Sequence, residues 1–84
     1  MRLTIYSKPG CHLCDEMKSV VHRVIARHSN DDAIVLDEID ISSDRELLDR
    51  YGAEIPVLLI DGKKMGKYRV SEEQLTRMLE ARKG

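Results

Sequence analysis

The 84-residue chain has no tryptophan and no phenylalanine, and three tyrosines are its only aromatic residues. Its core must therefore be built from leucine, isoleucine, valine and methionine. Hydrophobic residues make up 42% of the chain and charged residues 35%. That balance is typical of a soluble globular protein. At this length we expect residues 1–84 to form a single domain.

The sequence also lacks an excess of charge of either sign and a long hydrophobic run. Lysine and arginine number 14 against 15 aspartates and glutamates, so no overall positive field attracts nucleic acid or an anionic membrane. No apolar run approaches the roughly 20 residues that span a bilayer, and no phosphate-cradling glycine motif is present. The chain begins directly in a strand pattern without a secretory signal, so we expect a cytoplasmic, reducing location.

Cysteine is scarce as well, and the two cysteines present are Cys11 and Cys14. They follow a strand-like run and the turn Lys8-Pro9-Gly10, and they open a helix-like run. Residues three apart share one face of a helix, so their Cα atoms are close enough for a disulfide. In a reducing compartment such a pair is more often a redox dithiol than a structural cross-link. Two unreactive cysteines that happen to be neighbours are the alternative.

The position of each cysteine predicts its role in catalysis. Cys11 comes first, where free backbone N–H groups and the helix dipole favour its thiolate, so it is the predicted nucleophile. Lys8 on the preceding turn adds positive charge, whereas Asp15 and Glu16 compete for the same positive helix end. Cys14, one turn into the helix, is the predicted buried thiol that resolves a mixed disulfide on Cys11.

Hydrophobic periodicity predicts seven elements in the order β-α-β-α-β-β-α. The strand–helix–strand start implies parallel pairing of the first two strands, and Asp61-Gly62 is a hairpin turn signal. Two capping boxes, at 43–46 and 71–74, each open a helix. The predicted elements are strands at 2–7, 33–40, 57–60 and 63–68, and helices from 11 to 28, from 43 to 51 and from 71 to 83.

This order predicts an α/β fold in which a four-stranded mixed sheet is flanked by helices. The run 57–60 is continuously apolar, as in a central strand, and 63–68 is the antiparallel edge strand. We expect the second helix to bury Leu47, Leu48 and Tyr51 and Gly52 to follow it as the C′ residue. His28 is expected to pack at the end of the first helix's apolar stripe.

The segment Tyr6-Ser-Lys-Pro-Gly-Cys-x-x-Cys14 resembles the active-site segment of glutaredoxins. The Gly-Cys-His-Leu-Cys sequence around His12 is similar to that of a group of small glutaredoxin-like proteins. The predicted element order matches the glutaredoxin branch over essentially the whole chain. The resemblance implies a thioredoxin-like fold and thiol–disulfide exchange, with roles in electron transport and cell redox homeostasis. It makes the chain a single glutaredoxin-like domain of residues 1–84.

The resemblance also assigns a second element of the site, Ile55-Pro56. In thioredoxin-like proteins the residue before the corresponding proline lies beside the dithiol, and the peptide bond to that proline is cis. We therefore expect a cis Pro56 that, with Ile55, shapes the groove in which an extended partner pairs. A trans proline that merely begins a strand is the alternative.

Glutathione is implied only in part. Lys8, Ile55 and Pro56 match the positions with which glutaredoxins hold it, but the expected Gly-Gly and acidic pair are replaced by the segment 65–71. Ser71 and the backbone at the last helix start could receive a carboxylate. Lys67 and Arg69 could supply charge, or form a solvated edge-strand face, and Glu72 and Glu73 would repel an anion. We expect no required cofactor and leave glutathione open as the reductant.

A metal site is the other alternative. Cys11, His12 and Cys14 offer three ligands where a structural zinc wants four, and His22 and His28 lie too far along the helix. Some glutaredoxins bridge an iron–sulfur cluster between two chains. The alternative to an enzyme is therefore a module that binds a protein or such a cluster without turnover. The expected partners of a monomeric enzyme are disulfide-containing proteins or glutathione.

Overall fold

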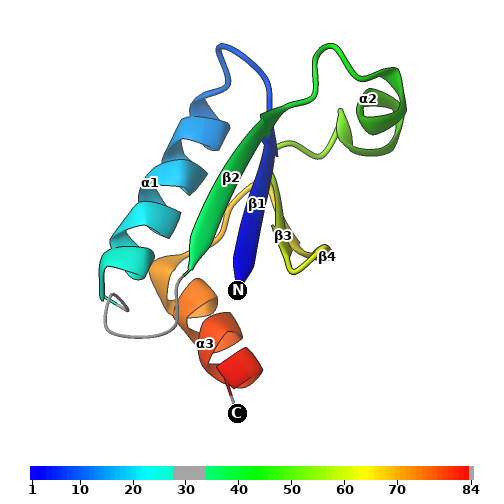
Figure 1. Cartoon of the computed structure of the whole chain (residues 1–84). Coiled ribbons are helices and arrows are strands. Elements are labelled where there is room, and N and C mark those ends of the chain that lie inside the picture. Colours follow the sequence, from blue (N-terminus) through cyan, green and yellow to red (C-terminus); the bar gives the residue numbers. More distant parts are fainter. Residues whose placement is uncertain (28–33, 84) are drawn as a thin grey trace.

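The computed structural model describes residues 1–27 and 34–83, and within these ranges it has the predicted element order (Figure 1). The ends predicted at His28 and Ala33 lie outside the described residues, as does the packing predicted for His28. Tyr68, predicted to end the last strand, follows it instead with φ +64°. The elements are β1 Arg2–Ser7, α1 His12–Arg27, β2 Val35–Asp40, α2 Arg45–Tyr51, β3 Val57–Ile60, β4 Lys63–Lys67 and α3 Glu72–Lys83.

The four strands form one mixed sheet in the order β2-β1-β3-β4. β1 is parallel to β2, with Leu3 opposite Leu36. β3 is antiparallel to both of its neighbours, with Ile5 of β1 opposite Leu58. Every residue of β3 is buried, as its continuous apolar sequence predicts for a central strand. The predicted mixed sheet is therefore confirmed.

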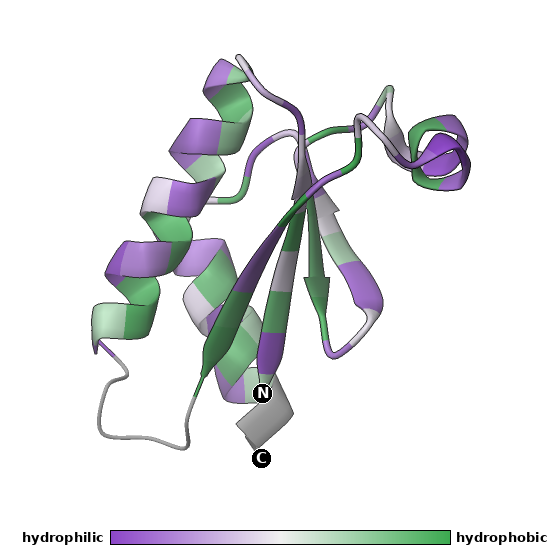
Figure 2. Cartoon of the chain, turned by 45° about the horizontal axis from the view of Figure 1, so that its top comes forward, coloured by the Kyte–Doolittle hydropathy of each residue, from purple (hydrophilic) through white to green (hydrophobic). Residues whose placement is uncertain are grey.

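Alternation along β1 explains where the core lies. Leu3, Ile5 and Ser7 are buried and face one side, whereas the intervening residues are only partly buried. α1 and α3 cover this side of the sheet (Figure 1), and their apolar faces turn toward it (Figure 2). Glu72 at the start of α3 pairs with Arg23 and Arg27 of α1, which ties the two helices together. No helix in the described ranges is long and apolar enough to cross a membrane.

The local turn and cap signals around β3, β4 and α3 are confirmed. Asp61 and Gly62 have φ of +50° and +85°, as a two-residue turn between antiparallel strands requires. The Ser71 hydroxyl accepts from the Gln74 N–H at 3.0 Å, and the Gln74 side chain accepts from the Ser71 N–H at 2.9 Å. These two bonds are the reciprocal pair of a capping box.

The ends of α2 differ from the prediction by small shifts. Asp44, rather than Ser43, is the N-cap, because its side chain accepts from the Leu47 N–H at 3.1 Å. Gly52 does not take the left-handed conformation of a C′ glycine: its φ is −56°, and its N–H bonds to the Leu48 carbonyl. The predicted capping box is therefore wrong, although the helix begins where expected.

The predicted buried stripe of α2 is also wrong. Leu47, Leu48 and Tyr51 are only partly buried, and α2 has no fully buried residue. The helix lies apart from α1 and α3, at the end of the sheet where β1 finishes (Figure 1). Tyr51 makes its contact at the rim, with its ring centroid 5.0 Å from that of Tyr6. Periodicity locates the apolar face of a helix, but how deeply that face is buried depends on the position of the neighbouring elements.

Candidate dithiol site

The two cysteines lie at the N-terminal end of α1. Gly10, with φ +76°, turns the chain after β1 in a conformation that favours glycine. Cys11 precedes the helix, and its carbonyl accepts the helix's first hydrogen bond, from the Asp15 N–H at 3.2 Å. The Cα atoms of Cys11 and Cys14 are 5.2 Å apart, and their Sγ atoms lie at disulfide distance. The backbone therefore holds the two cysteines at a spacing that suits a disulfide.

The two sulfurs have different surroundings. Cys14 is 2% exposed, whereas Cys11 is partly exposed. The Cys14 backbone N–H donates to the Cys11 Sγ at 3.1 Å, so an orphan donor at the helix start points at this sulfur. A hydrogen bond from an N–H group favours a sulfur that carries negative charge. Cys11 is thus placed to be reached by a partner, and Cys14 lies behind it.

Ile55-Pro56 lies at the same end of the sheet. The peptide bond is cis, as expected. Val57 follows at once and pairs with Tyr6, the residue before the end of β1. Pro56 is buried, and its carbonyl accepts from the Tyr68 N–H at 2.9 Å. The pairing of β1 with β3 therefore brings Ile55-Pro56 to the end of the sheet at which the chain leaves β1 toward Cys11.

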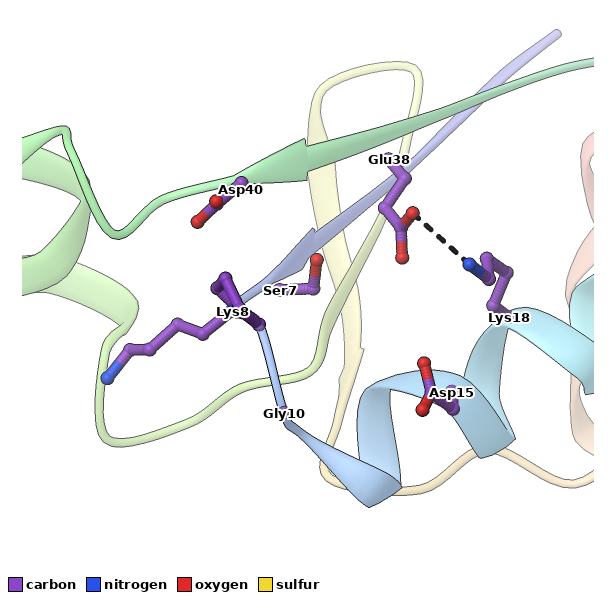
Figure 3. A pocket seen from close by; sticks show the side chains of 8 residues that line it. Ser7, Lys8, Gly10, Asp15, Lys18, Glu38 and Asp40 are labelled. Atoms are coloured by element: carbon purple, nitrogen blue, oxygen red, sulfur yellow. Dashed lines mark hydrogen bonds and ion pairs between the residues drawn. The ribbon is translucent and has the colours of Figure 1, made fainter.

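A polar hollow of about 290 Å³ lies between the turn that precedes Cys11, α1 and β2 (Figure 3). We call it the acidic hollow, because three carboxylates and two lysines line it. Sequence reasoning missed it, since its walls come from three separate segments and no local spacing marks them. The residues that line it are Ser7, Lys8, Pro9, Gly10, Asp15, Lys18, Glu38 and Asp40.

A glutaredoxin-like domain model (DUF836) matches residues 2–80 of the chain. The protein belongs to this glutaredoxin-like family. A glutaredoxin-like protein of Dictyostelium discoideum is 27% identical over 77 residues, which cover 89% of this chain and 71% of the relative.

Solved structures of thioredoxin fold agree with this assignment. The X. campestris protein XcR50 is 26% identical with a TM-score of 0.69, over 94% of this chain and 96% of that one. The germline-specific thioredoxin Deadhead of Drosophila melanogaster is 25% identical with a TM-score of 0.60, over 95% and 78%. The glutaredoxin-like resemblance and the thioredoxin-like fold implied by the dithiol segment are therefore both confirmed.

In this glutaredoxin-like protein three of the groups that could hold a glutathione carboxylate already have partners. Lys67 pairs with Glu54 at 3.6 Å, and Arg69 lies 3.8 Å from a Glu16 carboxylate oxygen. The Ser71 hydroxyl and N–H are both used in the α3 cap. Lys8 is partly exposed, and its side chain extends away from the acidic hollow (Figure 3). Lys8 is closer in sequence to the two cysteines than Lys67 or Arg69 is.

Glu54 is a second residue that sequence reasoning missed. Its carboxylate pairs with Lys64 and Lys67 of β4. The hydrogen bond from Lys64, followed by the charges of both lysines, holds the pKa of Glu54 below 4.5. The Tyr68 hydroxyl adds a bond to the Ala53 carbonyl at 3.2 Å. These contacts fasten the chain just before Ile55-Pro56 to the edge strand.

The histidines lie apart from any ligand cluster within the described residues. His12, between the cysteines, and His22, further along α1, are both exposed, and His28 lies outside the described residues. In the described part of the chain, no three His, Cys, Asp or Glu side chains converge as metal ligands. The Sγ atoms of Cys11 and Cys14 lie at disulfide distance from each other.

Proposed function

We propose that this protein is a thiol–disulfide oxidoreductase in which Cys11 attacks and Cys14 resolves. One observation carries the proposal: a partly exposed Cys11 at the N-terminal end of α1, with a 2%-exposed Cys14 whose Cα is 5.2 Å away. A two-step exchange needs one thiol that a partner can reach and a second, inaccessible thiol close to the first.

In the first step the Cys11 thiolate attacks one sulfur of a partner disulfide. An S–S bond forms between Cys11 and the partner, the partner's own S–S bond breaks, and its second sulfur leaves as a thiolate that takes a proton from water. The Cys14 N–H, 3.1 Å from the Cys11 Sγ, favours the attacking anion. Cys11 is thus the only one of the two sulfurs that must meet the partner.

In the second step Cys14 gives up its proton to solvent and attacks the Cys11 sulfur. The mixed disulfide breaks, the partner leaves with its second thiolate, and the Cys11–Cys14 disulfide forms. Two electrons have moved from the dithiol to the partner. Glutathione or a protein dithiol would supply two electrons to restore the reduced enzyme, and Lys8, Ile55 and Pro56 are the residues proposed to contact the partner.

The same proposal places the protein in the cytoplasm as a monomer whose partners are disulfide-containing proteins or glutathione. It needs no cofactor of its own, and it contributes to electron transport and cell redox homeostasis. Cytoplasmic thiol pools are reducing enough to keep such dithiols in their active state.

Single cysteine variants test the proposal. Cys14→Ser should still attack a protein disulfide and accumulate a mixed disulfide, visible by mass spectrometry and reversed by dithiothreitol. Cys11→Ser, the matched control, should form none and should lose disulfide reductase activity. Equal reduction rates in both variants and the native protein would refute the assignment. Repeating the native assay with glutathione or with a thioredoxin reductase system as electron donor identifies the reductant.

A further inference from the structure

The acidic hollow borders the turn that leads into Cys11. Pro9 and Gly10 form part of its wall and immediately precede Cys11. Asp15 lines it from the first turns of α1, and Glu38 and Asp40 line it from β2 (Figure 3). A group bound there would therefore lie near the turn that carries Cys11.

The charges in the hollow leave carboxylates without a cation. Lys18 and Glu38 satisfy each other at 3.3 Å, and the Lys8 side chain points away from the space that Ser7, Asp15 and Glu38 surround (Figure 3). Asp15 and Asp40 take part in no ion pair with another described residue. Hydrogen bonds from the Ser42 side chain and N–H hold the pKa of Asp40 below 3.8, so it stays charged at neutral pH.

An independent observation points to a ligand in the same place. Ser7 is 6% exposed, and its side chain lines the hollow that Asp15 and Glu38 also line (Figure 3). Within the described ranges this hydroxyl makes no hydrogen bond. A hydroxyl on a side chain this little exposed ordinarily has a partner, so a water or a polar group of a ligand is expected beside it.

We propose that the acidic hollow receives the lysine or arginine side chain of a disulfide-containing partner, close to the cysteine that Cys11 attacks. The inference rests on the proposed function and specifies its substrate class. In the view of Figure 3 the Asp15 and Asp40 carboxylates lie on opposite sides of Ser7. A cationic side chain would gain either carboxylate together with the Ser7 hydroxyl as acceptors, whereas an acidic one would be repelled by both carboxylates. An extended peptide advances about 3.3–3.6 Å per residue, so the basic residue should lie within a few positions of the partner cysteine.

Three matched peptides test the proposal. Each carries one cysteine in a mixed disulfide with a small chromogenic thiol, and the residue two positions from that cysteine is arginine, glycine or glutamate. The measured quantity is the second-order rate constant for thiol release by the reduced protein. Native protein should react about three- to tenfold faster with the arginine peptide than with the glycine peptide, and more slowly with the glutamate peptide. High salt should reduce these differences.

The double variant Asp15→Asn/Asp40→Asn should bring the arginine-to-glycine ratio to about one. The ratio is the readout because Asp15 lies near the positive end of α1, so its replacement also alters Cys11 reactivity toward all peptides alike. Asp49→Asn/Glu80→Gln is the matched control, because it also removes two negative charges but at exposed residues of other helices, α2 and α3. It should keep the native ratio, and Ser7→Ala should lower it partially.

The outcomes separate this proposal from the proposed function. Equal rates for all three peptides, or an unchanged ratio in the Asp15→Asn/Asp40→Asn variant, overturn the basic-residue site while the oxidoreductase stands. No reaction with any peptide counts against the oxidoreductase itself. A binding measurement then decides the site: N-acetylarginine amide should shift the amide NMR signals of Ser7, Gly10 and Asp15 in the oxidised protein. N-acetylglutamine amide should not, and no arginine-specific shift overturns the proposal.

Discussion

Reducing the Cys11–Cys14 disulfide should leave the protein folded and only slightly less stable. The two cysteines are separated by three positions, so the bond closes a ring of just four residues. A disulfide stabilises a fold largely by restricting the unfolded chain, and the restriction grows with the length of the closed loop. A bond in so small a ring can contribute little to the free energy of unfolding.

The loop length gives the magnitude. For four residues the chain-entropy relation yields about 2 kcal/mol at 25 °C, against about 3 kcal/mol for a 15-residue loop. By the thermodynamic cycle, 2 kcal/mol corresponds to a native dithiol about 40 mV more reducing than the same dithiol in the unfolded chain. Stabilisation of a Cys11 thiolate by the Cys14 N–H works in the opposite direction. The value of 2 kcal/mol is therefore an upper limit.

The assay is urea unfolding of the oxidised and the reduced protein, followed by circular dichroism. Their midpoints should differ by no more than 2 kcal/mol divided by the urea m-value, about 1–3 kcal/mol/M for a small protein. Cys11→Ser cannot form the bond, so its midpoint should not respond to reductant. A reduced protein that is unfolded, or destabilised by more than about 4 kcal/mol, would show a structural cross-link and refute the redox interpretation.

Three further predictions concern the frame that holds the site. Glu54→Gln should lower the free energy of unfolding at neutral pH, because the pairing with Lys64 lowers the pKa of the folded Glu54 carboxyl relative to the unfolded one. The difference in stability between the variant and the native protein should fade below pH 4.5, and urea unfolding measured from pH 7 to pH 2 checks this. Leu75→Ala removes a fully buried side chain of α3 and should cost about 2–5 kcal/mol in urea unfolding, with an exposed site such as Glu80→Ala as control. Asp44→Ala removes the α2 cap and should cost about 1 kcal/mol, whereas Ser43→Ala should cost little; equal losses would contradict the observed cap.

The hydrophobic pattern was sufficient to predict the element order and the mixed sheet. Alternation marks β1, an unbroken apolar run marks β3, and Asp61-Gly62 marks the hairpin, since each signal depends on contacts within a few residues. The cis state of Pro56 came from the family resemblance, because sequence statistics alone favour trans. The α2 cap was misplaced by one residue because Ser43 and Asp44 are both good caps, and only the folded geometry chooses between them.

The order of residues along the chain is enough to place two cysteines one helical turn apart after a Pro-Gly turn, because helix geometry converts a spacing of three into a shared face. The surroundings of these cysteines depend on how the chain folds. The acidic hollow joins β1, α1 and β2, and the Glu54 contacts join a loop to β4, so each depends on strand pairing between distant segments. The side chain of a charged residue takes its direction only in the folded backbone. Here Asp15 lines the acidic hollow, and the side chain of Lys8 points away from it (Figure 3).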